Sequence, residues 1–284
     1  MRQAEQLKNE TFVDGSANVA CREDTLAAHR RAVERVITDA RERLCEPISL
    51  HDMSRVAYLS AFHFNRVFHQ ITGLPPNKFV SALRLDQAKR LLLNTNLSIT
   101  DVCFEVGYNS LSTFTRRFTQ QVGLGPREFR YLGERITSAS VESLCAHYAE
   151  LAQRATLQAA FPAVEGFVDS PKPAGPIFVG LFPAHIPQSR PIGGTLLTSP
   201  GAFRLGPVPD GIYHLLAAAL PHLSDTLGYL LPDSGNLLVG AANGPVIVRA
   251  GRANRQFKIS LRQMALTDPP LLVSLPFLLA DAVK

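Results

Sequence analysis

The stretch SAFHFNRVFHQITGLPPNKF, residues Ser60–Phe79, returns fifty residues later as SLSTFTRRFTQQVGLGPREF, residues Ser110–Phe129. Nine of the twenty positions are identical, namely Ser60/Ser110, Phe64/Phe114, Arg66/Arg116, Phe68/Phe118, Gln70/Gln120, Gly73/Gly123, Leu74/Leu124, Pro76/Pro126 and Phe79/Phe129. Upstream the match continues at an offset of 49, with Ser49, Leu50 and Met53 against Ser98, Ile99 and Val102. One copy therefore has an extra residue in the turn before its serine. A repeat of this period indicates one supersecondary unit used twice.

Each copy has the pattern of a short helix, a tight turn and a second helix. Ser49 and Ser60 are placed to cap the two helices of the first copy, and Gly73 is placed to end the second helix. Ser98, Ser110 and Gly123 repeat that pattern. A longer helical pattern after Pro76 connects the copies, so this part of the chain is predicted to be all α.

The second helix of each copy has an apolar face and a polar face. Apolar residues at helical spacing should face the core, and they are Phe64, Val67, Phe68 and Ile71 in the first copy and Phe114, Phe118 and Val122 in the second. The opposite faces carry Phe62, Asn65, Arg66 and His69, then Ser112, Thr115, Arg116 and Thr119. Arginine can bond guanine bidentately in a major groove, and asparagine can do the same for adenine.

A polar outer face is also what any surface helix presents, so a single copy would favour that simpler interpretation. The recurrence of arginine at the same helical position, Arg66 and Arg116, weakens it. Phe62 has two interpretations that the sequence leaves open. It makes either a local hydrophobic contact or a contact with thymine methyl groups.

With these residues in place, residues from about 28 to 135 resemble the double helix-turn-helix domain of AraC/XylS-type transcriptional regulators. Matching positions outside the repeat include Leu59, Arg84, Ala88, Leu91, Gly107, Tyr108 and Arg130. Ser54 and Cys103 depart from the alanine usual there, but both are small enough to pack between helices. The resemblance implies that each second helix enters a major groove. It implies base-reading positions at Phe62, Asn65, Arg66, Leu111, Ser112, Thr115 and Arg116.

Charge and composition agree with a nucleic-acid partner. The formal net charge is +5, and residues 28–137 hold 16 Lys/Arg against 10 Asp/Glu. The four cysteines, Cys21, Cys45, Cys103 and Cys145, lack the paired spacing of a zinc site or disulfide framework, so we expect reduced, mostly buried thiols. The first residues form no signal peptide and no apolar run spans a bilayer, which predicts a cytoplasmic, nucleoid-associated protein without membrane contact.

The C-terminal half has a different character. Short apolar runs separated by Gly, Pro and Asp predict an antiparallel β-sandwich. Within it, the stretch GAFRLGPVPDGIYHLLA, residues 201–217, resembles a hairpin of transthyretin-like or carboxypeptidase-regulatory-like sandwiches. The whole chain is thus predicted to be a multidomain α + β protein with a homeodomain-like helical domain first. Its expected parts are a flexible tail at 1–26, the DNA-binding domain at 27–136, a helix and linker at 137–176, and a sensor or dimerisation domain at 177–284.

The function predicted is sequence-specific regulation of transcription. An enzyme is disfavoured because the sequence has no HExxH, P-loop or Gly-x-Ser-x-Gly motif, and no cofactor or metal is expected. His185, His214 and His222 could be brought together by folding, but scattered histidines are the simpler interpretation. The alternatives are a non-specific architectural DNA-binding protein and a protein-interaction module acting through the β half. Expected partners are double-stranded DNA and RNA polymerase, with a small-molecule effector and a homodimer also open.

Overall fold

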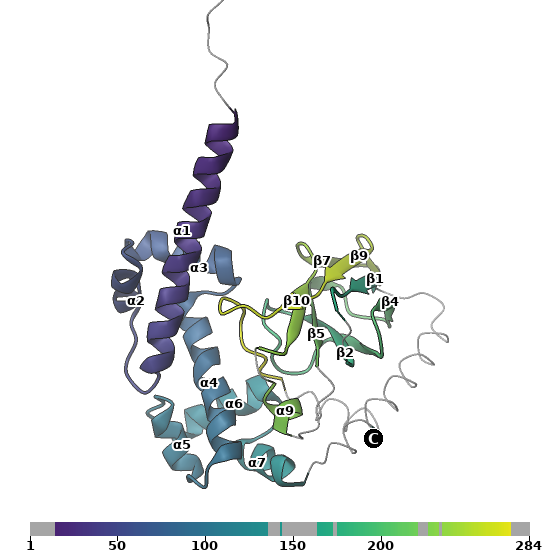
Figure 1. Cartoon of the computed structure of the whole chain (residues 1–284). Helices are drawn as coiled ribbons and strands as arrows, with labels where there is room; N and C mark the ends of the chain where they lie inside the picture. Colours follow the sequence, from purple (N-terminus) through teal and green to yellow (C-terminus); the bar gives the residue numbers. More distant parts are fainter. Residues whose placement is uncertain are drawn as a thin grey trace, which may run out of the picture.

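The computed structural model describes residues 15–135, 143, 164–172, 175–220, 227–232 and 235–273. The regular structure of residues 15–135 is helical, and the strands all lie beyond residue 163 (Figure 1). The expected helix over 141–155 falls outside the described residues, apart from position 143. Within these ranges no helix combines the length and the apolar character needed to cross a bilayer.

The helical domain contains two structurally similar helix pairs on one long connecting helix. The helices are α1 Gly15–Glu42, α2 Leu50–Ala57, α3 Ala61–Thr72, α4 Pro76–Asn94, α5 Ile99–Glu105, α6 Leu111–Val122 and α7 Pro126–Arg135. The pair α2–α3 lies near one end of α4, and the pair α5–α6 lies near the other (Figure 1). The repeat predicted from the sequence is therefore a repeat in the fold.

The repeated serines cap the helices as predicted. Ser49 accepts a hydrogen bond from the backbone N–H of Asp52 at 3.1 Å, and the Asp52 carboxylate accepts one from the backbone N–H of Ser49 at 3.2 Å. Ser98 and Asp101 form the same reciprocal capping box in the second copy. Hydrogen bonds from Ser49 also hold the pKa of the Asp52 carboxyl below its ordinary value. The short supporting helices α2 and α5 thus start by the same mechanism.

The turns inside the two pairs use a left-handed residue at the equivalent position. In the first pair this residue is Tyr58, with φ 57°, and in the second it is Gly107, with φ 78°. Tyr58 is 85% exposed, so its side chain meets no obstacle. A Cβ atom at Gly107 would lie 2.3 Å from the carbonyl oxygen of Leu44. Only the second turn therefore requires glycine.

Replacing Gly107 with alanine is expected to destabilise the helical domain by about 1–3 kcal/mol, because the left-handed backbone and the close Leu44 carbonyl both penalise a Cβ. Chemical denaturation followed by circular dichroism measures the change. The matched control is Tyr58→Ala, which leaves a Cβ at an equivalent but open turn and should shift stability by less than about 1 kcal/mol. Equal effects of the two substitutions would refute this account of the turn.

The helical core is built around aromatic side chains that repeat with the sequence. Phe64, Phe68 and Phe79 stack edge to face, with ring centroids 5.4 Å apart in each contact. Phe114, Phe118 and Phe129 form the equivalent contacts at 5.7 Å, with the first pair of rings tilted and the second edge to face. Ser54 and Cys103 are both buried, as expected for small residues between helices.

The N-terminal boundary differs from the expectation of a loose tail over 1–26. Helix α1 begins at Gly15, and residues before 15 lie outside the described ranges. This first part of α1 extends away from the body of the domain (Figure 1), so it needs no apolar stripe. Its two alanines, one arginine and one glutamate favour a helix by intrinsic propensity, which hydrophobic periodicity does not reveal.

The C-terminal half is rich in strands. They are β1 Val164–Asp169, β2 Ile177–Phe182, β3 Gly193–Leu197, β4 Gly201–Leu205, β5 Gly211–Ala219, β6 Leu238–Ala241, β7 Val246–Arg249, β8 Arg252–Ala253, β9 Phe257–Ser260 and β10 Arg262–Gln263, with a short helix α9 Leu227–Leu230. One sheet has the order β4-β1-β9, and the larger one has β10-β6-β5-β2-β3, with β7 pairing β5. Alternate residues of both sheets meet in one core that includes Val168, Leu181 and Leu215.

Three features of this half differ from the sequence expectations. First, β1 lies at residues 164–169, inside the expected linker. Second, β1 pairs with β9 in parallel, whereas the other pairings are antiparallel. A parallel pair needs a long connection, and here all the intervening strands provide it.

Third, β4 and β5 do not form the expected hairpin. Phe203, Leu205, Tyr213 and Leu215 are buried as predicted, but β4 pairs with β1 and β5 pairs with β2. The chain crosses between the two sheets at this turn, and Asp210 in the turn contacts the segment between β7 and β8. Its carboxylate accepts hydrogen bonds from the backbone N–H groups of Ala250 and Gly251, at 2.9 and 3.0 Å.

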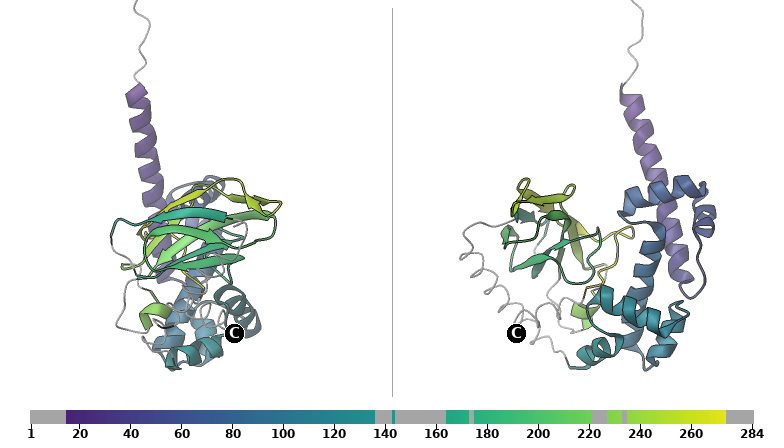
Figure 2. Two further views of the ribbon diagram at one scale, coloured as in Figure 1. Left: turned by 90° about the vertical axis from the view of Figure 1, so that its right-hand side faces the viewer. Right: turned by 180° about the vertical axis from the view of Figure 1, so that it is seen from behind.

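The β domain docks on the helical domain through two loops and α9. Ile186, Leu230 and Leu272 from the β half are buried in the core cluster of the helical half. The backbone N–H of Ser189 donates to the carbonyl of Gln121 at 2.7 Å, and the Lys89 ammonium donates to the carbonyl of Leu271 at 3.0 Å. Figure 2 shows the two halves side by side when seen from behind (right), and the strands in front of the helical domain after a quarter turn (left).

Candidate nucleic-acid interface

Helix α3 presents the polar face that the sequence predicted. Ser60 precedes it as N-cap and accepts a hydrogen bond from the backbone N–H of His63 at 3.4 Å. Phe64, Val67 and Phe68 are buried against the core, which turns the opposite side of the helix to solvent. Phe62 is 83% exposed, and Asn65 and Arg66 are exposed as well. A local hydrophobic contact does not bury Phe62 in this structure.

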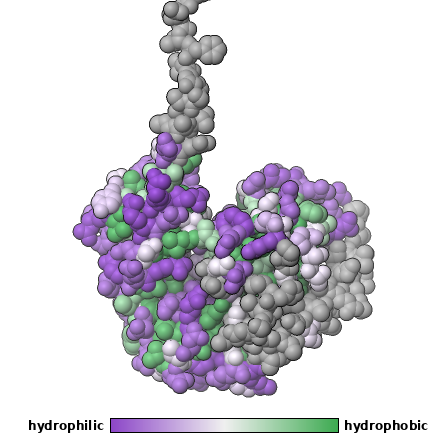
Figure 3. Space-filling view, in the orientation of Figure 1, coloured by the Kyte–Doolittle hydropathy of each residue, from purple (hydrophilic) through white to green (hydrophobic). Residues whose placement is uncertain are grey.

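Helix α6 presents the corresponding face in the second copy. Its N-cap Ser110 accepts from the backbone N–H of Thr113 at 3.4 Å, and its Oγ lies 3.0 Å from Ser112 Oγ. Leu111, Ser112 and Arg116 are exposed, and Thr115 is half-buried. The structure thus brings the seven predicted positions to the outer sides of two equivalent helices. Figure 3 shows a hydrophilic surface over much of this domain, with scattered hydrophobic patches.

Neither α3 nor α6 carries an aspartate or glutamate anywhere along its length. The acidic residues of the two helix pairs lie instead on the supporting helices α2 and α5, where Asp52 and Asp101 cap the first turns. A helix without carboxylates, whose N-terminal amides point outward, is compatible with an approaching phosphate backbone. The local electrostatics therefore favour an anionic partner at α3 and α6.

Some arginines of the domain bond to backbone carbonyls, some form ion pairs within their own helix or its end, and some have no carboxylate partner among the described residues. Arg84 donates to the carbonyl of Glu46 at 2.7 Å, and Arg130 donates to the carbonyls of Leu92 and Leu97 at 3.0 and 2.7 Å. These two residues tie the connecting helix and α7 to neighbouring loops. Arg66 has a contact at 3.5 Å with the Nδ1 atom of His63. Neither Arg66 nor Arg116 forms an ion pair within the described part of the chain.

The structure adds residues to this surface that the predicted set omitted. Tyr58 is exposed in the turn directly before α3, and the guanidinium of Arg35 lies 5.7 Å from its ring centroid. Arg117 is exposed next to Arg116, although its counterpart Val67 is buried in the first copy. Aligning the two copies at the offset of 49 pairs Tyr58 with Gly107, and that alignment could have marked Tyr58 as an unusual residue in the turn.

The histidines and cysteines of the described residues form no cluster suited to metal binding. His185 and His214 lie together, with ring centroids 5.4 Å apart, whereas His222 falls outside the described residues. Cys103 is buried but Cys45 is exposed, so the expectation of buried thiols holds for only one of the two described cysteines. Among the described residues no group of three or more His, Cys, Asp or Glu side chains could hold a metal ion.

Comparisons with known proteins identify a helix-turn-helix domain in the part of the chain that contains α3 and α6. A family model described as a helix-turn-helix domain matches residues 53–131. The chain is 32% identical over 87 residues to the uncharacterised HTH-type transcriptional regulator YobQ of Bacillus subtilis, a match that covers 31% of this chain and 36% of that protein. It is 29% identical over 87 residues to the HTH-type transcriptional activator AarP of Providencia stuartii, covering 31% of this chain and 64% of AarP. The chain thus spans less than two thirds of either relative.

Among solved structures, the DNA-binding domain of AdpA, a global transcriptional factor in complex with a target DNA, is 30% identical. That match covers 36% of this chain and 95% of the AdpA chain, with a TM-score of 0.35.

Proposed function

Because residues 53–131 make this chain a member of the AraC/XylS family of helix-turn-helix regulators, we propose that the whole protein is a sequence-specific regulator of bacterial transcription. In this proposal α3 and α6 enter successive major grooves on one side of the duplex, about 34 Å apart along its axis. Helix α4 sets their separation. The chain acts in the cytoplasm, on the nucleoid.

One observation carries the proposal. Arg66 and Arg116 occupy the same position on two equivalent helices, both are exposed, and neither is engaged by a carboxylate in the described part of the chain. Structural arginines in this domain, such as Arg84, are instead bound to backbone carbonyls. Two unpaired guanidinium groups on faces without carboxylates match the requirements of base and phosphate contacts.

We assign the predicted positions the following roles. Asn65 and Arg66 have the donor patterns that read adenine and guanine, and the exposed Phe62 ring suits a thymine methyl group. In α6, Arg116 contacts either a base or a phosphate, while the shorter side chains of Leu111, Ser112 and Thr115 contact only the nearest parts of the DNA. The first helix therefore contributes more sequence discrimination, and the second contributes more anchoring. Tyr58 and Arg117 extend the surface as candidate phosphate contacts.

The remaining assignments are part of the same proposal. RNA polymerase is the partner through which bound regulators of this kind act, and the β half is a sensor or a dimerisation domain. For that half we propose a β-sandwich of the transthyretin or carboxypeptidase-regulatory type, supported by the two sheets that share one core. The domain boundaries at 27–136 and 177–284 are proposed with one change, since β1 extends the second domain back to residue 164.

Two alternative functions would use DNA differently from a specific regulator. A non-specific architectural protein would use the same basic surface without base readout, and an interaction module would not need α3 and α6 at all. Genome-wide mapping of bound DNA supplies candidate operators, and competition with random DNA at matched salt separates the first alternative from a specific regulator. Only a specific regulator keeps an affinity ratio of about 1,000 or more under those conditions.

Arg66→Ala is expected to weaken operator binding by roughly 10- to 100-fold and to reduce discrimination at one base pair, because a bidentate contact to a base is lost. Arg116→Ala should weaken binding as well, with a smaller effect on specificity. Gel-shift titrations at fixed salt against the operator and its single-base variants measure both effects.

The control for net charge is Arg204→Ala in β4, which removes one exposed arginine far from α3 and α6 in sequence. It should leave operator affinity within about threefold of wild type, since one distant surface charge contributes little at physiological salt. If Arg66→Ala and Arg116→Ala both bind the operator as wild type does, DNA recognition through these helices is wrong.

A further inference from the structure

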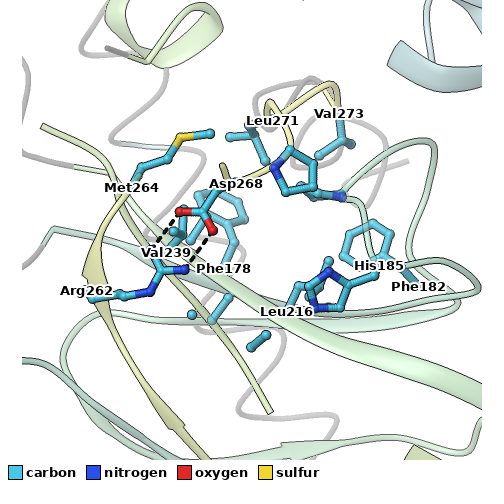
Figure 4. Close-up of a pocket in the computed structure, with 17 residues that line it drawn as sticks. Phe178, Phe182, His185, Leu216, Val239, Arg262, Met264, Asp268, Leu271 and Val273 are labelled. Atoms are coloured by element: carbon cyan, nitrogen blue, oxygen red, sulfur yellow. Dashed lines mark hydrogen bonds and ion pairs between the residues drawn. The ribbon is translucent and has the colours of Figure 1, made fainter. Parts of the chain in front are cut away.

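A pocket lies on the outer face of the larger sheet. Strand alternation turns Ile177, Val179 and Leu181 of β2 toward the core between the sheets, so that Phe178, Gly180 and Phe182 face the other way. The same alternation in β5 leaves Leu216 and Ala218 on this outer face. Together with the chain from Arg262 to Val273, these residues enclose a cavity of about 110 Å³ (Figure 4).

The lining of the pocket is almost entirely apolar, and its one ion pair is internally satisfied. Arg262 donates two hydrogen bonds to the Asp268 carboxylate, at 2.6 and 2.7 Å, and Asp268 also accepts from the backbone N–H of Ala265 at 2.7 Å. Burial lowers the pKa of His185, the other titratable group of the lining, which keeps its ring neutral near pH 7. No unpaired charge of the lining is thus available to a charged ligand, and an uncharged apolar molecule fits best.

The cavity volume limits the size of the ligand. An apolar cavity of about 150 Å³ accepts benzene and stays free of water when empty. A cavity of about 110 Å³ that is partly open at one side accommodates a single six-membered ring or an aliphatic molecule of similar size. Its aromatic walls, Phe178 and Phe182, favour a ring.

The two loops that close the pocket, one containing His185 and Pro187 and the other containing Leu271, also contact the helical domain. His185 and Pro187 line the cavity, and the same loop buries Ile186 in the helical core and bonds Ser189 to the carbonyls of Gln120 and Gln121 at the end of α6. The His185 ring also packs against Gly73, where α3 ends. On the other side of the cavity, Leu271 lines it and accepts the hydrogen bond from Lys89 of α4.

These loops also bond to each other. The backbone N–H groups of Leu272 and Val273 both donate to the carbonyl of Pro187, at 3.2 and 3.1 Å. A molecule in the cavity therefore contacts two loops that are bonded to each other. These loops also contact the ends of α3 and α6 and Lys89 of α4.

We propose that this pocket binds a small uncharged ring compound, and that the bound molecule stabilises the contacts of both loops with α3, α4 and α6. The consequence for operator binding rests on the proposed function, whereas the ligand site itself does not. Filling the cavity adds contacts to loops that hold the ends of the two recognition helices. The ligand thus restricts the relative positions that α3 and α6 adopt.

The test of binding uses the full chain and fluorobenzene as the probe, followed by ¹⁹F NMR. We expect saturable binding with a dissociation constant of about 1 mM or tighter, which is well within what a ligand of this size achieves. Benzoate, a ring of the same size with a carboxylate, should bind at least about 10-fold more weakly, because its charge finds no free partner. Ala218→Leu fills the cavity from the sheet and should reduce fluorobenzene binding at least about 10-fold.

Two further variants keep the test decisive. Met264→Phe fills the mouth of the cavity from a half-buried position and should also abolish saturable binding, even if Ala218→Leu folds poorly. Ala202→Leu makes the same change as Ala218→Leu at an exposed position of β4 and should bind the probe like wild type. Absence of saturable binding by wild type, or equal binding by all variants, would overturn the proposed site.

The coupling is tested separately by amide hydrogen exchange with and without saturating fluorobenzene. Exchange should slow at Gly73, at residues 121–123 and at 271–273 in wild type and in Ala202→Leu, but not in Ala218→Leu. Probe binding without slower exchange at the ends of α3 and α6 would refute the coupling. Neither measurement contains DNA, so a chain that passes both but selects no operator refutes only the proposed function.

Discussion

Phe68→Ala is expected to lower the free energy of unfolding by about 3–5 kcal/mol, because it removes a buried aromatic ring and leaves a cavity that the surrounding helices cannot close. Phe68 is 1% exposed, and its ring contacts Phe64 and Phe79 edge to face at 5.4 Å. A loss of this size is a large part of the about 5–15 kcal/mol that stabilises a typical domain. Urea denaturation of the full chain, followed by circular dichroism, measures it.

The same helix offers a matched control. Phe62→Ala makes the identical chemical change at a ring that is 83% exposed, and it should alter stability by less than about 0.5 kcal/mol. It should nevertheless weaken operator binding if the Phe62 ring contacts a base, so the two substitutions separate folding from recognition. Similar losses of stability in both variants would contradict the assignment of inner and outer faces on α3.

The free energy of unfolding is expected to rise with pH because of Lys89, and this rise should be absent in Lys89→Met. The ammonium group is 1% exposed in the middle of α4, 5.8 Å from the Phe129 ring centroid, and burial lowers its pKa from 10.5 to about 8. Asp86 opposes this shift and Arg90 adds to it. The unfolded chain therefore holds this proton more tightly than the folded chain, and stability increases between pH 8 and 10.5, by about 3 kcal/mol in total.

The measurement compares urea denaturation of wild type and Lys89→Met from pH 7 to 10.5. Other groups titrate in the same range, but they do so in both proteins, so the difference isolates Lys89. At high pH the variant should be the less stable one, because the carbonyl of Leu271 loses its hydrogen bond and stays buried, at a cost of about 1–3 kcal/mol. Parallel pH profiles for the two proteins would show that Lys89 titrates normally in the folded state.

Much of the helical domain could be predicted because its information is local and occurs twice. Capping serines, terminating glycines and inward phenylalanines each determine structure within a few residues, and two agreeing copies reduce the ambiguity of either one. The candidate interface followed from the same logic, since a helix with a buried side has a known opposite side. Tyr58 was missed because it lies in a turn, where periodicity carries no signal.

The wrong predictions concern the β half, where the fold depends on pairing between strands that are far apart in the sequence. The hydrophobic alternation of β4 and β5 correctly identified Phe203 and Tyr213 as buried, but alternation does not say which strand is the neighbour. Asp210 bonds to a turn forty residues away, and β1 pairs with β9 across nearly a hundred residues. Such pairings depend on how the whole chain closes its sheets, and a local pattern cannot specify them.

The double unit, its inner and outer faces and the matched arginines Arg66 and Arg116 follow from the sequence alone, because helix periodicity and capping are encoded within one or two turns. Where the β half contacts that unit follows only from the tertiary structure. It brings the loops of Ile186 and Leu271, separated by 85 residues, onto the ends of α3 and α6 and onto Lys89, and encloses a cavity behind them. The physical reason is that docking depends on which surfaces remain apolar after each domain has folded, a property of the assembled fold.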